Sequence, residues 1–244
     1  MSRVALVTGS SRGIGRAIAV ALAESGIQVA VNFNHDAEAA KHTLSLVEAA
    51  GSEGVCVQAD ISNSSEVKRC FEEVEDALGP VEVLVNNAGA RADGLVLRMS
   101  DEAWDEVIGV NLFGTFACTR RALGPMLAGR WGRIVNVASV AGLRGSPGQA
   151  NYAAAKGGVV ALTKTLAREV AGRGVTINAV APGLIDTDLT AGLTESQREA
   201  LLSQVPQGKA GTPEDVAGLV SWLCAEKAGF VTGSVFVTDG GMTA

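Results

Sequence analysis

The 244-residue sequence has few of the side chains that metal and thiol chemistry require. Its two histidines, His35 and His42, lie in or beside one polar helical stretch, which argues against a histidine-based triad or a histidine-ligated metal. Its four cysteines are widely separated and form no C-x-x-C pair, so neither a redox motif nor a zinc knuckle is present. We therefore expect no metal site.

Positive charge and long apolar runs are also lacking. The formal net charge of −6 argues against general nucleic-acid binding, although it permits local basic patches. No apolar run approaches the roughly 20 residues that a bilayer span needs. The N-terminal RVALVTG reads as a strand, without the basic region or cleavage site of a secretion signal. We expect a cytoplasmic protein with no nucleic-acid or membrane partner.

Short apolar runs alternate with longer helical stretches along the whole chain. The runs are continuous rather than alternating in polarity, as in strands that are covered on both faces. This order predicts an α/β fold with one Rossmann-type, doubly wound parallel sheet and helices on both faces. With no linker or repeat in between, residues 1–244 are predicted to form a single domain. The predicted strands begin near residues 4, 27, 54, 81, 133, 175 and 234, and the predicted helices cover residues 13–25, 36–50, 62–78, 100–128, 151–171 and a stretch from 213 onward.

The first predicted strand runs into a glycine-rich turn, T-G-S-S-R-G-I-G, which opens a helix. Gly9, Gly13 and Gly15 let the backbone approach a pyrophosphate, which then lies at the positive end of the helix. The spacing G-x-x-x-G-x-G departs from the usual dinucleotide fingerprint G-x-G-x-x-G. A tight turn is the alternative, but the position after the first strand favours a nucleotide.

Residues after the next strands indicate which nucleotide is bound. An NAD site places a carboxylate at the end of the second strand, yet this chain has Asn34 there and no acid before Asp36. Arg12 supplies a cation for a 2′-phosphate, so the pattern favours NADP over NAD. Asp60, after the third strand, either accepts from the adenine or caps the following helix. The Asn-Asn-Ala-Gly run 86–89 either lines a cofactor channel or forms a polar turn.

Tyr152 is the only tyrosine, and Lys156 follows four positions later. On a helix this spacing places both side chains on one face. A free phenol has a pKa near 10, and a fixed ammonium beside it favours the phenolate. The pair is therefore a candidate acid/base for neutral pH, although any solvated helix face can carry such a spacing.

Several motifs together resemble the short-chain dehydrogenases/reductases over essentially the whole chain. They are TGSSRGIG, NNAG, Asn111, Ser139, Tyr152-x-x-x-Lys156 and Pro182-Gly183, in the family's order and spacing. Longer segments, among them GSPGQANYAAAKGG and the tail GFVTGSVFVTDGGM, are similar to those of bacterial 3-oxoacyl-[acyl-carrier-protein] reductases. The resemblance implies an NADP(H)-dependent reductase of fatty acid synthesis that acts on acyl carrier protein thioesters.

The resemblance also implies a catalytic tetrad. Tyr152 would give its proton to the substrate carbonyl, and Ser139 would hydrogen-bond that carbonyl and stabilise the oxyanion. Lys156 would lower the pKa of Tyr152 and hold the nicotinamide ribose. Asn111, an awkward residue inside a helix by propensity, would bend the helix and hold a water that resupplies protons.

Further binding residues follow from the same resemblance. Ile185 and Thr187 are candidates for the nicotinamide carboxamide, Gln149 is a candidate substrate contact, and residues of about 187–210 resemble the family's lid. The predicted cofactor residues are Gly9, Ser11, Arg12, Gly13, Ile14, Gly15, Asn34, Asp60, Ile61, Asn87, Ala88, Gly89, Tyr152, Lys156, Pro182, Gly183, Ile185 and Thr187.

Two arginines are candidates for docking an acidic carrier protein. Arg130 and Arg173 lie near predicted helix ends, where the resembling reductases place their docking arginines. Arginines near helix C-termini also favour the helix dipole without any docking role. The long helices 100–128 and 151–171 form the tetramer interface in the family, so a homotetramer is expected.

Two other functions remain open at this point. The same chemistry serves other carbonyls, such as acetoacetyl-CoA, a polyketide, or a sugar or steroid alcohol. A non-catalytic dinucleotide-sensing protein can share the fold, although it would have no need to keep Asn111, Ser139, Tyr152 and Lys156 together.

Overall fold

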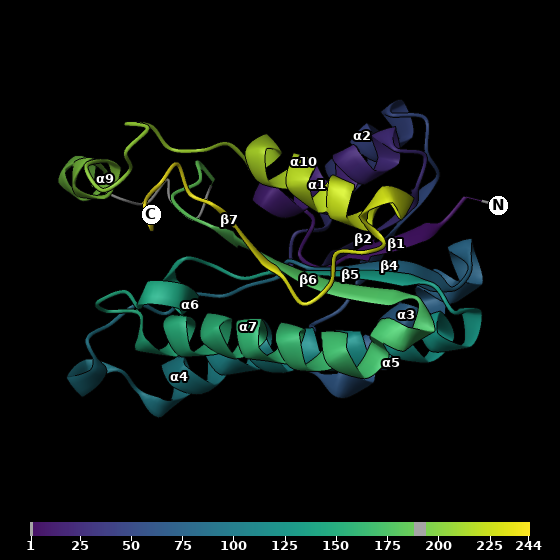
Figure 1. The fold of residues 1–244 in the computed structure, drawn as a ribbon, viewed down its shortest axis with the longest axis horizontal. Helices are drawn as coiled ribbons and strands as arrows, with labels where there is room; N and C mark the ends of the chain where they lie inside the picture. The colour runs from purple at the N-terminus through teal and green to yellow at the C-terminus, as the bar shows by residue number, and fades with distance from the viewer. Residues whose placement is uncertain (1, 188–193) are drawn as a thin grey trace.

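The computed structural model describes residues 2–187 and 194–244. Within this part of the chain, seven strands form one parallel sheet in the order β3-β2-β1-β4-β5-β6-β7 (Figure 1). The prediction of a doubly wound Rossmann-type sheet is confirmed. The strands are β1 (Val4–Val7), β2 (Gln28–Phe33), β3 (Gly54–Gln58), β4 (Val81–Asn86), β5 (Gly132–Val137), β6 (Val175–Pro182) and β7 (Val235–Thr238).

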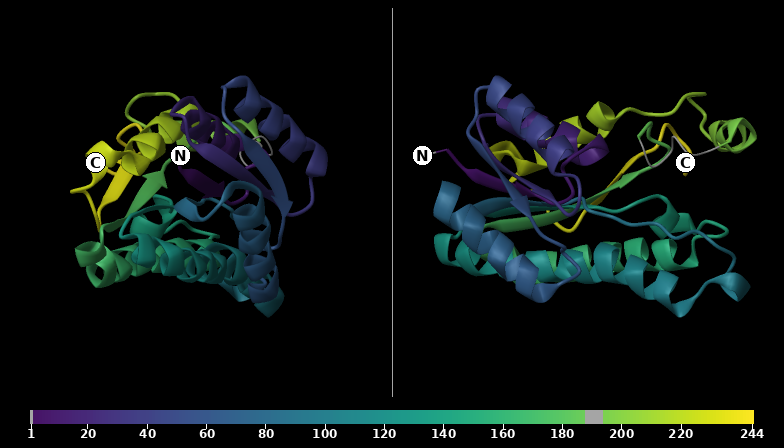
Figure 2. Two further views of the ribbon diagram at one scale, coloured as in Figure 1. Left: turned by 90° about the vertical axis from the view of Figure 1, so that its right-hand side faces the viewer. Right: turned by 180° about the vertical axis from the view of Figure 1, so that it is seen from behind.

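Helices cover both faces of the sheet. The helices α1 (Gly13–Glu24), α2 (Ala37–Ala49) and α10 (Pro213–Cys224) lie on one face. The helices α3 (Ser64–Leu78), α5 (Gly114–Gly129) and α7 (Ala150–Val170) lie on the other, as both figures show (Figures 1 and 2). Shorter elements are α4 (Asp101–Ile108), α6 (Ala141–Arg144), α9 (Glu195–Leu202) and the 3-10 turns Val96–Arg98, Ala171–Arg173 and Glu226–Ala228. None of the helices in the described ranges has both the length and the apolar character of a membrane span.

The continuous apolar strands contribute side chains to two hydrophobic cores, one on each face of the sheet. Val7 and Val31 face α1 and α10, whereas Leu6 and Ile134 face α3 and α5, and all four are fully buried. Burial of one such side chain contributes about 1.5–3 kcal/mol. The pattern of Val, Ile, Leu and Ala without polar alternation is thus explained by helices on both sides.

The strand order reverses between β1 and β4, where the following loops diverge and leave a crevice. The hydroxyl of Thr8, just after β1, accepts from the backbone N–H of Asn87, at 3.0 Å, and of Ala88, at 3.1 Å. The two loops are therefore held together at the floor of the crevice.

The predicted helix over residues 100–128 is not continuous. Between α4 and α5, residues Gly109–Phe113 form a π-helical segment. The amide Nδ2 of Asn111 lies inside it and donates to the carbonyl of Val107 at 2.9 Å. A side-chain donor that occupies a main-chain acceptor competes with the regular helical ladder. The prediction of a helical region over residues 100–128 with Asn111 as an awkward position is confirmed, and the irregularity at Asn111 takes the form of a π-helical segment.

Candidate active site

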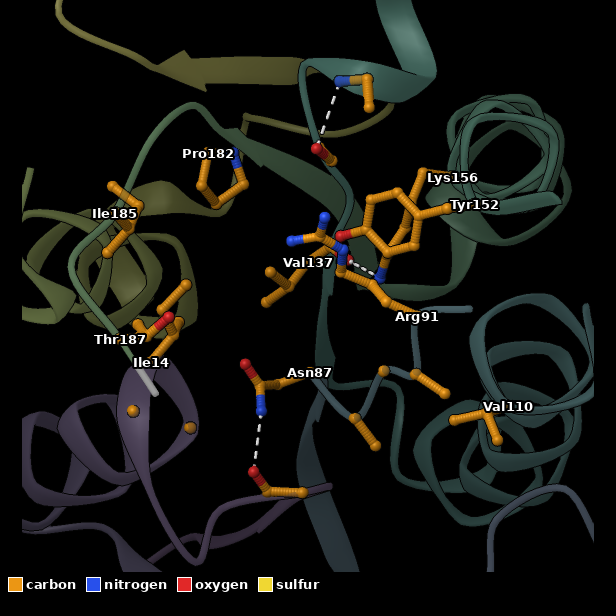
Figure 3. A pocket seen from close by; sticks show the side chains of 18 of the residues that line it. Ile14, Asn87, Arg91, Val110, Val137, Tyr152, Lys156, Pro182, Ile185 and Thr187 are labelled. Atoms are coloured by element: carbon orange, nitrogen blue, oxygen red, sulfur yellow. Dashed lines mark hydrogen bonds between the residues drawn. The ribbon is translucent and has the colours of Figure 1, made fainter. Parts of the chain in front are cut away.

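A cleft of about 800 Å³ opens at the carboxyl ends of β1, β4, β5 and β6. Figure 3 shows Tyr152, Lys156 and Arg91 along one wall, with Ile185 and Thr187 on the opposite wall. The structure brings every predicted cofactor residue into this cleft, together with Ser139 and Gln149. The residues of the predicted lid from 188 to 193 lie outside the described part of the chain, whereas Gln197 and Leu201 of α9 line the cleft.

The turn after β1 requires glycine at two positions. Gly9 has a φ of +61°, and a Cβ there would lie 2.7 Å from the Cα of Ala88. A Cβ on Gly15 would lie 2.5 Å from both the Gly9 carbonyl oxygen and Nδ2 of Asn87. That Asn87 amide donates to the carbonyls of Thr8 and Gly9, each at 3.0 Å. The glycines thus allow the two loops and the start of α1 to pack against one another.

The N-terminus of α1 suits a bound anion. Arg12 occupies the N-cap position with an extended backbone, φ −159°. An arginine side chain has no hydrogen-bond acceptor, so it is unable to cap the first backbone N–H groups as Ser or Asp would. The first turn also contains no acidic residue. The residues present therefore fit the pyrophosphate of a dinucleotide, which the helix dipole favours at this end.

The end of β2 carries no carboxylate directed to a ribose. Asn32 is buried, accepts from the Gly9 N–H at 3.1 Å and donates to the carbonyls of Val57 and Ala59, each at 3.2 Å. The carboxylate of Asp36 accepts from the N–H of Ala39 at 2.9 Å and so caps α2. This arrangement fits the prediction of NADP over NAD.

Asp60 does not cap the following helix. Its carboxylate accepts from the backbone N–H of Ser62 at 2.8 Å and from the Ser62 hydroxyl at 2.7 Å. The cap of α3 is Asn63, which accepts from the N–H of Ser65 at 3.0 Å. The alternative of a capping role for Asp60 was therefore wrong, because a residue nearer to the helix takes that place.

Tyr152 lies on α7 with its hydroxyl toward Ser139, which follows the last residue of β5 by two positions. Burial raises the pKa of Tyr152, while a hydrogen bond with the Ser139 side chain and the positive charge of Arg91 act in the opposite direction. The expected lowering of the Tyr152 pKa by Lys156 is not found in this structure. The reason is geometric: Nζ of Lys156 lies 5.7 Å from the centre of the Tyr152 ring and donates instead to the carbonyl of Val137 at 2.7 Å.

Lys156 is a buried cation at the floor of the cleft, with 3% of its surface exposed. Burial lowers the pKa of this ammonium to about 8, because the charged form loses hydration. A group with that pKa changes its charge near neutral pH, which suits a residue that passes or holds protons.

Asn111 is fully buried behind the cleft, beside Lys156. Its Nδ2 donates to the carbonyls of Ala90 and Val107, each at 2.9 Å, whereas its Oδ1 has no hydrogen-bond partner among the described residues. A Cβ added to Gly89 would lie 2.9 Å from this Oδ1 and 3.8 Å from Nζ of Lys156. A buried acceptor aimed at a small space beside an ammonium is a site that an ordered water satisfies.

Comparison with known proteins places this cleft in a family. Residues 9–243 match the family model described as enoyl-(acyl carrier protein) reductase. The chain belongs to the short-chain dehydrogenase/reductase family. It is 46% identical over 242 residues to 3-oxoacyl-[acyl-carrier-protein] reductase FabG of Staphylococcus aureus, which covers 99% of this chain and 98% of that one. It is 48% identical over 242 residues to 3-oxoacyl-[acyl-carrier-protein] reductase of Synechocystis, an alignment that covers 99% of this chain and 97% of the relative. It is 44% identical over 240 residues to 3-oxoacyl-[acyl-carrier-protein] reductase FabG of Aquifex aeolicus, and that alignment covers 98% of this chain and 97% of the relative.

Several residues in and behind the cleft of this short-chain dehydrogenase/reductase belong to no sequence motif and were not predicted. Arg91 and Asp93 line it from the loop after β4, and Met242 lines it from near the C-terminus. Asn151, adjacent to Tyr152, is fully buried and donates to the carbonyls of Ala92 and Ala103, each at 3.0 Å. The available signal was position, since Arg91 and Asp93 follow NNAG at the carboxyl end of a strand.

The two predicted docking arginines lie together, but not at this cleft. Arg130 ends α5 in the left-handed conformation, with φ 54°, and Arg173 donates to the carbonyl of Leu127 at 3.4 Å. Arg130 lies just before β5 and Arg173 just before β6, at the amino ends of these strands, whereas the cleft lies at the carboxyl ends. Along α7, the 18 residue-to-residue steps from Tyr152 to Val170 span about 27 Å at 1.5 Å per step, so these arginines are remote from Tyr152 of the same chain.

Proposed function

We propose that this protein is an NADPH-dependent reductase that converts 3-oxoacyl-[acyl-carrier-protein] to 3-hydroxyacyl-[acyl-carrier-protein] in fatty acid synthesis, in the cytoplasm. The observation that carries the proposal is one cleft that joins an anion-binding helix terminus to Ser139, Tyr152 and Lys156. The names of relatives 44–48% identical over nearly the full chain supply the substrate class. The whole chain, residues 1–244, acts as one domain in this proposal.

The residues divide the chemistry between them. Bound NADPH supplies a hydride to the C3 carbonyl of the substrate. Tyr152 donates its hydroxyl proton to the carbonyl oxygen, and the Ser139 hydroxyl hydrogen-bonds the same oxygen as negative charge develops there. A phenol with the ordinary pKa of about 10 is protonated at neutral pH, as an acid must be, and burial raises the pKa of Tyr152 further.

Lys156 and Asn111 restore the proton. Lys156 would hold the ribose of the bound cofactor with its ammonium, and its pKa of about 8 suits a group that passes a proton toward Tyr152. Oδ1 of Asn111, buried and without a partner in the described structure, holds a water next to Lys156. Protons then return to Tyr152 from the interior side of the cleft while substrate occupies the outer side.

The assembly in this proposal is a homotetramer. Trp104 on α4, Phe113 at the end of the π-helical segment and Phe116 on α5 are exposed apolar side chains, which supports their burial against a second copy. Antiparallel packing of α5 and α7 against a second copy would carry Arg130 and Arg173 toward the cleft of that copy. The carrier protein would then dock on one subunit and react in another.

A side-by-side assay tests the function and its cofactor. NADPH and NADH consumption are followed with acetoacetyl thioesters of acyl carrier protein and of CoA. We expect NADPH to be preferred, and Arg12→Ala to lower kcat/KM for NADPH by about 10- to 100-fold with little change for NADH, because a charged hydrogen bond to the 2′-phosphate is lost. Faster turnover of the unmodified enzyme with NADH would contradict the cofactor assignment. Turnover of the CoA thioester alone would identify a reductase of another acyl carrier.

Docking is tested by Arg130→Gly. Glycine adopts the left-handed conformation of residue 130 without strain, so the free energy of unfolding should increase by about 0.5–1 kcal/mol. Loss of the guanidinium should raise KM for the carrier protein thioester by about 3- to 5-fold, the scale of an exposed ion pair, and leave KM for the CoA thioester unchanged. An equal change in KM for both thioesters would show that Arg130 does not dock the carrier protein.

A further inference from the structure

In the loop after β4, hydrogen bonds fix the backbone on both sides of Arg91. The carbonyl before it, of Ala90, accepts from Nδ2 of Asn111 at 2.9 Å, and the carbonyl after it, of Ala92, accepts from Nδ2 of Asn151 at 3.0 Å. Both asparagines are fully buried. The N–H of Gly94 further along donates to the carbonyl of Gly148 at 2.8 Å. The backbone on both sides of Arg91 is therefore fixed to the helices behind the cleft.

The guanidinium of Arg91 is also oriented. Its Nε donates to Asp93 at 3.3 Å and its Nη2 bonds the other carboxylate oxygen, so the pair is bidentate. Nε2 of Gln149 donates to the same carboxylate, at 3.1 Å and 3.3 Å. Asp93 thus takes two of the five N–H donors of Arg91. An ordinary surface ion pair has neither a third side chain such as Gln149 on its carboxylate nor buried asparagines that hold its backbone.

The oriented guanidinium lies in the reaction cleft. Arg91, Asp93 and Gln149 all line it, and Figure 3 shows the Arg91 side chain extending toward the hydroxyl end of Tyr152. Its side chain is 29% exposed, so it is accessible from the cleft. Burial raises the pKa of Tyr152, the charge of Arg91 acts in the opposite direction, and the carboxylate of Asp93 acts in the same direction as burial.

A 3-oxoacyl thioester has two carbonyl oxygens, on C3 and C1, separated by one methylene. If Tyr152 and Ser139 hold the C3 oxygen, the C1 oxygen must lie in the immediate neighbourhood of the same hydroxyls. Arg91 presents N–H donors there, and a buried carbonyl left without a donor would cost about 1–3 kcal/mol.

We propose that Arg91, held by Asp93 and Gln149, is a specificity-determining residue that donates a hydrogen bond to the C1 thioester carbonyl of the substrate. The proposal rests on the proposed function, since it assigns a contact to the second carbonyl of that substrate. It explains how the cleft distinguishes a 3-oxoacyl thioester from an isolated ketone of the same size.

The test uses two CoA substrates that differ at one group. Acetoacetyl-CoA carries the C1 carbonyl, and S-(3-oxobutyl)-CoA has a methylene in its place. For Arg91→Met we expect kcat/KM to fall by about 10- to 100-fold with acetoacetyl-CoA and by less than about 3-fold with the thioether, because only the first substrate loses a hydrogen bond to a charged donor. For Arg91→Lys, which keeps the positive charge but lacks the planar guanidinium, kcat/KM with acetoacetyl-CoA should lie between that of the unmodified enzyme and that of Arg91→Met. If turnover of the thioether is too slow, its inhibition constant against acetoacetyl-CoA gives the same comparison.

Arg144→Met is the matched control. Arg144 also lines the cleft, but its guanidinium donates to Oε1 of Gln204 at 3.1 Å. Its removal changes the net charge of the cleft equally and should leave the ratio between the two substrates unaltered. Equal losses for both substrates in Arg91→Met would show that Arg91 acts only through Tyr152 and would overturn the proposal, as would no loss at all. Unmodified enzyme that reduces the thioether but no thioester would instead overturn the proposed function.

Discussion

Replacement of Tyr152 by phenylalanine is expected to lower kcat/KM for the oxoacyl thioester substrate by about 1,000-fold, within the range that general acids contribute. The substitution removes one oxygen and keeps the ring, so packing on α7 is preserved. Only the proton donor and its hydrogen bond with Ser139 are lost. Steady-state NADPH oxidation measures the effect, and binding of NADP+ by calorimetry serves as the control for an intact site. Full activity without the hydroxyl would end the proposed mechanism.

The same residue reports its own pKa. Tyr152 is the only tyrosine in the chain, so ultraviolet absorbance of phenolate has a single source in this protein. Because burial raises the pKa of Tyr152, the ligand-free enzyme should form phenolate above the ordinary pKa of about 10. The signal should be absent from Tyr152→Phe. A titration in the ligand-free enzyme well below 10 would show that Lys156, rather than burial, controls the phenol.

Replacement of Lys156 by methionine is expected to lower kcat/KM by about 100-fold or more, since the variant lacks the ammonium that holds the cofactor ribose and returns a proton to Tyr152. In the unmodified enzyme the ammonium has a pKa of about 8. It is charged below that pH and neutral above it. Reductase activity should therefore decrease as the pH rises through about 8, and the residual activity of Lys156→Met should lack this step.

Lys156→Met should also stabilise the ligand-free protein. The pKa of Lys156 is about 8 when folded and 10.5 by its ordinary value, so below pH 8 the folded state carries a charge that it disfavours. Removal of that charge, offset by the lost bond to the Val137 carbonyl, should increase the free energy of unfolding at pH 7 by about 1–2 kcal/mol.

The pH dependence gives that stability prediction its sign. Between pH 8 and 10.5 the unfolded chain binds a proton at Lys156 that the folded chain lacks, so the stability of the unmodified enzyme increases with pH over this window. The advantage of Lys156→Met in urea unfolding should shrink accordingly. Lys164→Met, on the exposed face of the same helix, is the matched control and should show neither effect. A less stable Lys156→Met at pH 7 would contradict a strained buried ammonium.

The fold followed from the sequence because its physical cause is local and repeated. Continuous apolar runs such as Val4–Val7 are compatible with burial on both faces, and glycine-ended helical stretches between them leave little choice of topology. The sequence left open the form that the 100–128 helix takes at Asn111. Propensity marks Asn111 as unfavourable in a helix, but whether a helix ends, kinks or takes a π-turn depends on which carbonyl its amide reaches. Here that choice is set by Val107 and by the distant Ala90.

The cleft residues were predictable where a motif fixes them and not where tertiary contacts do. Gly9, Ser139 and Tyr152 belong to patterns that carry their own chemistry. Arg91 lies in a loop without a motif, and its role depends on Asn151 and Gln149, which are about 60 residues away in the chain. The charge that acts on Tyr152 was likewise assigned to the neighbouring Lys156, because sequence spacing reveals the helix face but not the carbonyl that the ammonium contacts.

The side-chain amide of Asn111 contributes both to the position of the Arg91 loop and to the proton route beside Lys156. Nδ2 of Asn111 bridges the π-segment and the Ala90 carbonyl, while its Oδ1 faces the space beside Lys156. A substitution at this position would therefore disturb proton return and loosen the loop that carries Arg91 at once. Loss of activity in such a variant would not distinguish the two effects, because proton return and the choice of substrate both depend on this one side chain.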